Sequence, residues 1–199
     1  VAQWMNLDSQ CANAVAPLLV STEQGRCKST FCYILLPDEL QKFYIDKFDL
    51  SSESGCEQKL SLFGLVNMDE FDRYSVRSMA TLKNLMQLKK LTYRKSHRSY
   101  YSQLPRIASF IGTSNQKELL TDTTGSRRFL CVEVRGKIDC SRPDYVQLYA
   151  QLKAELQAGE RFWFTSEEER DIQMNNRMFY KHSPEEDVFF HCFRLPEAD

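Results

Sequence analysis

A short apolar run, a polar loop and a second apolar segment, together residues 13–31, constrain the fold of this chain more than any other stretch. The apolar run at residues 15–20 predicts a buried strand. The loop contains Gly25 and ends in Lys28 and Ser29, at the start of a helix predicted over residues 29–36. This order predicts a phosphate-binding loop, because backbone N–H groups and a lysine at a helix entry point at an anion and the serine can hold Mg²⁺.

The residues predicted to contact a nucleotide are eight consecutive positions of this loop. They are Glu23, Gln24, Gly25, Arg26, Cys27, Lys28, Ser29 and Thr30. The loop departs from the pattern GxxxxGK[ST], since Thr22 and Cys27 stand where glycines belong. Glycine adopts positive φ easily and Thr or Cys does not, so an ordinary polar turn before a helix stays open as the alternative.

Two adjacent carboxylates follow the second informative apolar run, residues 65–68. Ligands of open α/β sheets bind beyond the carboxyl ends of strands, so Asp69 and Glu70 are predicted to lie near the phosphate loop. There Asp69 would hold Mg²⁺ and Glu70 would polarise an attacking water. A solvated acidic turn is the alternative.

Polar residues also end a third apolar strand, predicted over residues 107–115. Asn115 at its end is a candidate for orienting a lytic water or sensing a γ-phosphate. Arg127 and Arg128 lie on the next polar loop and suit a transferring phosphate. A surface salt bridge is the alternative for these two arginines.

Basic residues alternate with tyrosines at residues 92–106. Arg94, Lys95 and Arg98, together with Arg106, would meet the phosphates of a nucleic-acid strand while the rings stack on bases. The alternative is a solvated hairpin whose tyrosines cover a sheet edge. Residues 43–50 alternate as in a strand, and the apolar spacing of residues 75–91 predicts a helix.

The composition indicates one globular unit. The chain has 199 residues and a formal charge of −1, so affinity for nucleic acid would need a local basic patch. The 7 cysteines are scattered and form no CxxC pair, which argues against structural zinc and is typical of a reduced, cytoplasmic protein. No apolar run is long enough for a membrane span and no leader opens the chain.

The C-terminal part has a different character, with helices predicted over residues 145–158 and 167–180. We therefore expect a core at residues 1–140 and a helical extension at residues 141–199, within one compact unit. Because the chain begins without Met and ends soon after Pro196, we also expect a fragment of a longer polypeptide.

Four segments in this order, LLVSTEQGRCKSTF, GLVNMDEFDR, LPRIASFIGTSN and LLTDTTGSRRFLCVEV, resemble the virulence-associated protein E family. These are P-loop ATPases of phages and mobile elements, related to superfamily-three helicases and often fused to a primase. The resemblance covers roughly residues 13–195 and is greatest to the variant of Bacteroides-type bacteria, which has a similar CKS loop.

The resemblance implies roles for the candidate residues. Lys28 and Ser29 match the Walker A lysine and magnesium-binding hydroxyl, and Asp69 and Glu70 match Walker B. Asn115 matches the polar sensor. Arg127 and Arg128 match paired arginines, of which at least one would be a finger reaching the γ-phosphate of a neighbouring subunit. A finger in trans implies a ring, commonly a hexamer, with Arg94, Lys95 and Arg98 gripping single-stranded or forked DNA.

The expected fold is α/β, a P-loop NTPase of the additional-strand type, with a mostly parallel five-stranded sheet and a helical C-terminal extension. The expected function is Mg²⁺-dependent ATP hydrolysis that drives a helicase-like or translocase-like motor in mobile-element or phage replication. A primase would lie elsewhere in a longer chain. A non-hydrolysing nucleic-acid-binding or assembly module with a degenerate loop, and a P-loop kinase or signalling ATPase, remain alternatives.

Overall fold

A parallel five-stranded sheet forms the centre of the computed structural model, which describes residues 1–5, 7, 14–50, 53–93, 102–122, 125–182, 185, 188–189 and 192–193. In spatial order its strands are β2 (Tyr44–Ile45), β3 (Leu65–Met68), β6 (Ser109–Ser114), β1 (Ala16–Val20) and β7 (Phe129–Glu133). All its pairings are parallel. The predicted α/β class and the five-stranded sheet are therefore confirmed.

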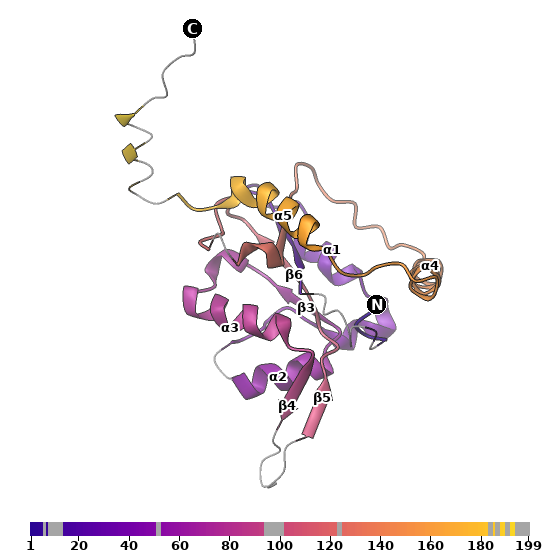
Figure 1. Cartoon of the computed structure of the whole chain (residues 1–199). Coiled ribbons are helices and arrows are strands. Elements are labelled where there is room, and N and C mark those ends of the chain that lie inside the picture. The colour runs from indigo at the N-terminus through magenta and orange to yellow at the C-terminus, as the bar shows by residue number, and fades with distance from the viewer. Residues whose placement is uncertain are drawn as a thin grey trace.

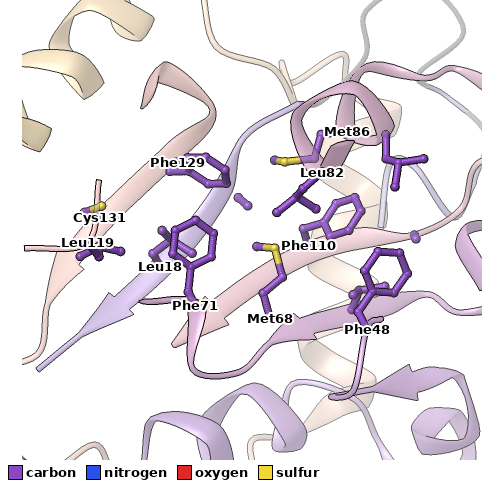
Figure 2. Close-up of a cluster of buried hydrophobic side chains, with 14 of the residues drawn as sticks. Leu18, Phe48, Met68, Phe71, Leu82, Met86, Phe110, Leu119, Phe129 and Cys131 are labelled. Atoms are coloured by element: carbon purple, nitrogen blue, oxygen red, sulfur yellow. The ribbon is translucent and has the colours of Figure 1, made fainter. Parts of the chain in front are cut away.

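Helices cover both faces of this sheet (Figure 1). Alternate side chains of each strand point to opposite faces, so both faces carry apolar side chains that need cover. On one face, Leu18, Met68 and Phe110 pack with Leu82 and other buried side chains of α2 (Glu53–Leu62) and α3 (Val76–Gln87) (Figure 2). On the other face, a smaller cluster joins Leu19, Leu65 and Ile111 to α1 (Lys28–Ile34). Burial on both faces explains why the central strands are apolar runs rather than alternating ones.

Two predicted elements are several residues longer than the observed ones. The strand expected at residues 43–50 is only β2, because this edge strand pairs on one side alone and Phe48 then enters the core from a loop. The helix expected at residues 75–91 ends at Gln87, since Leu91 belongs to β4 (Lys90–Tyr93) and is fully buried there. Two 3₁₀ helices, η1 (Asp38–Phe43) and η2 (Phe71–Arg73), complete this half.

An antiparallel pair, β4 with β5 (Ser102–Pro105), points away from the large sheet (Figure 1). Residues 94–101, between these strands, lie outside the described residues. Arg106, predicted as part of a basic surface, is only 2% exposed. Its guanidinium donates to the carbonyls of Leu85 and Met86, so it satisfies the C-terminal end of α3 instead of facing nucleic acid.

The C-terminal helices pack at two places on the sheet domain. Tyr145 and Tyr149 of α4 (Tyr145–Gln157) donate to carbonyls at the end of α1. The predicted second helix divides into α5 (Ser166–Asn175) and the 3₁₀ helix η4 (Asn176–Phe179). The division at residue 140 stays a prediction.

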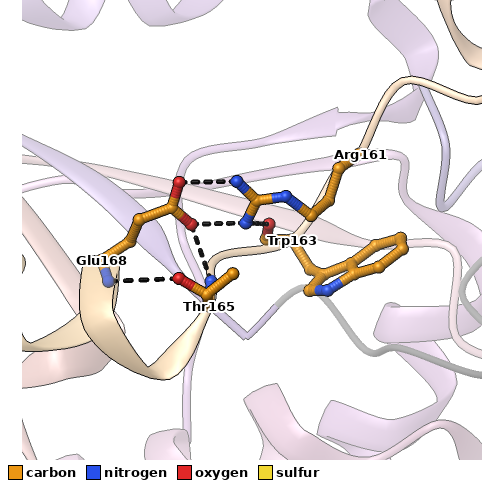
Figure 3. A network of polar contacts seen from close by, with 4 residues as sticks. All are labelled: Arg161, Trp163, Thr165 and Glu168. Atoms are coloured by element: carbon orange, nitrogen blue, oxygen red, sulfur yellow. Dashed lines mark hydrogen bonds and ion pairs between the residues drawn. The ribbon is translucent and has the colours of Figure 1, made fainter.

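The start of α5 is held by a small polar network (Figure 3). Thr165 and Glu168 form a reciprocal capping box, in which each side chain bonds the other's backbone N–H. Arg161 adds a two-pronged ion pair to the Glu168 carboxylate and donates to the Trp163 carbonyl at 2.8 Å. These contacts fix where the chain turns into α5.

Two asparagines at the end of α5, of which Asn176 is buried, cover the outer edge of β7. The Asn176 amide group donates to the carbonyls of Ser126 and Phe129, and its oxygen accepts from the Cys131 N–H. Asn175 donates to the Cys131 carbonyl at 2.9 Å. Side chains from the end of α5 thus replace the missing neighbour strand, which protects an exposed sheet edge.

Candidate active site

Three loops meet at the carboxyl edge of the sheet. Ser21 follows β1, Asp69 follows β3 and Asn115 follows β6, and β6 lies between the other two strands. The register brings these ends level, because Val20 pairs with Ser114 and Met68 with Gly112. The candidate residues of three distant segments therefore lie at one edge, as expected for parallel strands.

The loop between β1 and α1 has two residues with left-handed backbone. Gly25 has φ 76°, and Cys27, the N-cap of α1, has φ 62° and ψ 25°. Cys27 thus adopts the conformation that glycine favours, at an expected strain of roughly 1–2 kcal/mol. The segment after β7 supports the loop: Ile138 N–H donates to the Arg26 carbonyl at 3.1 Å and the Cys140 thiol contacts the Cys27 carbonyl.

Lys28 is the buried cation of this edge, with 8% of its surface exposed. Its Nζ donates to the Ser21 carbonyl at 3.3 Å and to Asn115 Oδ1 at 2.9 Å. Burial lowers the pKa of Lys28, while the charges of Asp69 and Asp72 oppose this shift. The lysine is therefore a largely desolvated cation held between the loop and β6.

Two hydroxyl groups donate hydrogen bonds to the Asp69 carboxylate. Ser29 Oγ donates to Asp69 Oδ1 at 2.8 Å, and Thr113 Oγ1 donates to the same oxygen. In the described part of the chain, no group of three or more His, Cys, Asp and Glu side chains is placed to hold a metal. One carboxylate and one hydroxyl nevertheless fit Mg²⁺, which keeps waters and takes further ligands from substrate phosphates.

Glu70 lies beside Asp69 in a strained conformation. Its φ of 51° is left-handed, and its carboxylate pairs with Arg73 at 2.7 Å. Cys27 and Glu70 are the non-glycine residues with positive φ among those that the structure describes. Such strain gathers at functional sites, and both residues flank the predicted phosphate position.

A virulence-associated protein E-like domain model matches residues 7–181. The chain belongs to this family. The resemblance deduced from the four segments is thereby confirmed at family level. No curated protein matches the chain.

Solved structures similar to this virulence-associated protein E-like chain include apo forms of the NrS-1 C-terminal region. One is 15% identical with a TM-score of 0.48, and covers 98% of this chain and 47% of that one. The A form is 15% identical with a TM-score of 0.45, and covers 98% and 46%. The chain thus spans about half the length of these structures.

The two predicted arginines of this virulence-associated protein E-like domain lie away from the other candidates. They belong to η3 (Ser126–Arg128), just before β7, and Phe129 pairs with Ala16 at the start of β1. The loop that leads into α1 follows the other end of β1, four residues after Ala16, so roughly 13 Å of strand separates it from the arginines. Arg127 contacts Glu169 at 3.6 Å, while Arg128 Nε is buried with no hydrogen-bond partner among the described residues.

The three predicted DNA contacts, Arg94, Lys95 and Arg98, lie outside the described residues. Near the acids, an open cavity of about 1140 Å³ is lined by Asp69, Glu70 and polar side chains of α3. Neither Lys28 nor any residue of the loop between β1 and α1 lines this cavity. Within the described residues, no helix is both long and apolar enough to cross a bilayer.

Sequence reasoning overlooked polar residues around the predicted ones. Thr113 contacts Asp69, and Ser114 Oγ donates to Asp72 Oδ1 at 2.7 Å. The Thr-Ser-Asn end of β6 was the available signal, because three consecutive polar residues at the end of a buried strand rarely serve packing. By contrast, no sequence pattern indicated that Ile138 and Cys140 would contact the loop.

Proposed function

We propose that this chain is the ATPase core of a DNA-acting motor that uses Mg²⁺ and serves replication of a phage or mobile element. The observation that carries the proposal is the convergence of Lys28, Ser29, Asp69 and Asn115 at one sheet edge. A lysine and serine at a helix entry, facing a carboxylate after a neighbouring strand, are the parts that phosphoryl transfer requires. The P-loop identity of the fold belongs to this proposal.

Each residue has a role that its position supports. Lys28 would neutralise phosphate oxygens, while the backbone N–H groups of residues 23–30 surround them. Ser29 and Asp69 would hold Mg²⁺, which when bound neutralises charge that develops on the phosphates. Glu70 would orient and deprotonate the attacking water, and Asn115 keeps Lys28 in place through the bond to its Nζ.

The placement of the arginines supports a site shared between subunits. Arg128 is half-buried beside Arg127, and burial followed by the charge of Arg127 lowers its pKa. The charges of Asp122 and Glu169 oppose this shift, and Arg128 Nε has no hydrogen-bond partner among the described residues. A cation at this opposite edge suits the γ-phosphate of a neighbouring copy better than that of its own chain. We therefore include a homo-oligomeric ring, commonly a hexamer in such motors, in the proposal.

DNA is the proposed partner, as the resemblance to the virulence-associated protein E family implies. The strands β4 and β5 project away from the five-stranded sheet. Arg94, Lys95 and Arg98, which lie between these strands in the sequence, would bind single-stranded or forked DNA. A primase domain in the same longer polypeptide and a cytoplasmic location complete the proposal. The proposed motor activity is movement along DNA. Unwinding of duplex DNA would be a further activity of the same motor.

The test is ATP hydrolysis by the full-length protein with and without single-stranded DNA. Lys28→Ala should abolish turnover, because it removes the cation that the phosphates would meet. Lys153→Ala is the matched control, since this lysine is exposed on α4 far along the chain. Unchanged turnover in Lys28→Ala would remove the loop from the mechanism.

A second candidate is a nucleic-acid-binding or assembly module that does not hydrolyse ATP. The strained Cys27, in place of a glycine, is the observation that favours it. It predicts DNA binding without turnover in wild type and Lys28→Ala alike. A kinase or signalling ATPase would instead turn over at a rate that DNA leaves unchanged.

A further inference from the structure

The last two residues of β6 and the residue that follows it each hold a charged residue from another segment. Thr113 donates to Asp69, Ser114 donates to Asp72, and Asn115 accepts from Lys28. Thr113 and Asn115 point to the face that α1 covers, because alternate strand residues share a face. This end of the central strand therefore joins the metal-binding and phosphate-binding halves of the site.

We propose that Thr113 is a positioning residue that sets the Mg²⁺ affinity of the site through Asp69. The inference rests on the proposed function and adds a residue to it. Thr113 is 3% exposed, and its hydroxyl donates to the Oδ1 atom that also accepts from Ser29. Two hydroxyl donors on one oxygen fix the rotation of the carboxylate and direct its other oxygen, Oδ2, toward the metal and its waters.

Burial makes the Thr113 contact more effective than the one from Ser29. Ser29 is exposed and would itself turn its oxygen to the metal, whereas Thr113 has no access to it except through Asp69. Partners of this kind change metal affinity by roughly 10–100-fold when removed.

The experiment compares wild type, Thr113→Val and Thr113→Ser in the full-length protein. Valine keeps the shape of threonine and removes the hydroxyl, while serine restores it. Ser109→Ala is the matched control, because it removes a hydroxyl from the other end of β6, where Ser109 donates to Gln3. The measurement is the Mg²⁺ concentration for half-maximal binding of a non-hydrolysable ATP analogue, alongside binding without metal and the thermal unfolding temperature.

We expect Thr113→Val to raise the half-saturating Mg²⁺ concentration by about tenfold, with metal-free nucleotide binding unchanged. Thr113→Ser should return the value to within about threefold of wild type, and Ser109→Ala should leave it unchanged. An unchanged Mg²⁺ requirement in a folded Thr113→Val would overturn the positioning role and leave the proposed function standing. Absence of Mg²⁺-dependent nucleotide binding in wild type would overturn both.

Discussion

At Cys27, a side chain occupies a backbone conformation that glycine adopts without strain. Neighbouring contacts maintain it: the Cys27 carbonyl accepts from Phe31 N–H at 2.9 Å and from the Cys140 thiol. The helix and the segment after β7 therefore impose the loop shape that the residue itself disfavours. The departure from the glycine pattern thus changes the energy of the loop more than its geometry.

Cys27→Gly should raise the free energy of unfolding by about 1 kcal/mol, because it removes left-handed strain. Denaturant unfolding measures this. Gly25→Ala should lower the free energy of unfolding by a similar amount, because alanine disfavours the φ of 76° at this position. An added Cβ would meet nothing within 4 Å, so the loss would come from the backbone conformation and not from a clash. Gly136→Ala is the control, as it also has open space but no positive φ. A loss of stability in Cys27→Gly would contradict the strain argument.

The edge strand β7 depends on the end of α5 for its hydrogen bonds. Asn176 is fully buried and serves three backbone groups, whereas Asn175 serves one. These contacts explain how a five-stranded sheet ends without exposing its last strand. The stability of β7 therefore depends on the end of α5.

Asn176→Ala should lower the free energy of unfolding by about 2–4 kcal/mol, because it leaves several buried backbone groups without partners. Asn175→Ala should cost about 1 kcal/mol, as it loses a single bond. Urea unfolding of both variants gives the comparison. Equal losses of stability in the two variants would contradict the claim that Asn176 is the main hydrogen-bond partner of the β7 edge.

The capping network of α5 should respond to acid. The Arg161 hydrogen bond, and then the Thr165 backbone N–H, lower the pKa of Glu168 to about 2. The pKa of Glu168 is lower in the folded chain than in the unfolded chain, where it is about 4.3. The network therefore stabilises the fold fully above pH about 4.3, and this contribution disappears as the pH falls through about 2. Carboxyl NMR titration should locate this midpoint, and Arg161→Gln should move it upward. A midpoint near 4 in wild type would contradict the network.

At the scale of the whole molecule, the candidate residues divide between two edges of the sheet. Lys28, Ser29, Asp69 and Asn115 lie at the carboxyl edge, and Arg128 precedes the amino end of β7. A single copy therefore brings the proposed phosphate-binding loop and an arginine to opposite edges. Repetition in a ring would place one opposite the other.

Arg128→Ala should reduce ATP turnover while leaving nucleotide binding within about twofold, because in the proposed ring this arginine acts on a neighbouring subunit and mainly in the transition state. Mixing it with Glu70→Gln subunits should restore part of the turnover, since some interfaces then contain both an intact acid and an intact arginine. Arg127→Ala, which removes the exposed partner of Glu169, is the comparison. No recovery in mixed oligomers would count against a shared site.

Local patterns in the sequence determined the parallel α/β class, the apolar strands and the three polar strand ends, because buried parallel strands require continuous apolar runs and the polar residues after them have few other roles. The tertiary structure decided what depends on distant partners. It placed Arg106 under α3, kept Cys27 left-handed, set Thr113 against Asp69 and covered β7 with Asn176. A lone Arg, Cys, Thr or Asn carries no signal of a partner dozens of residues away, and only packing brings the two together.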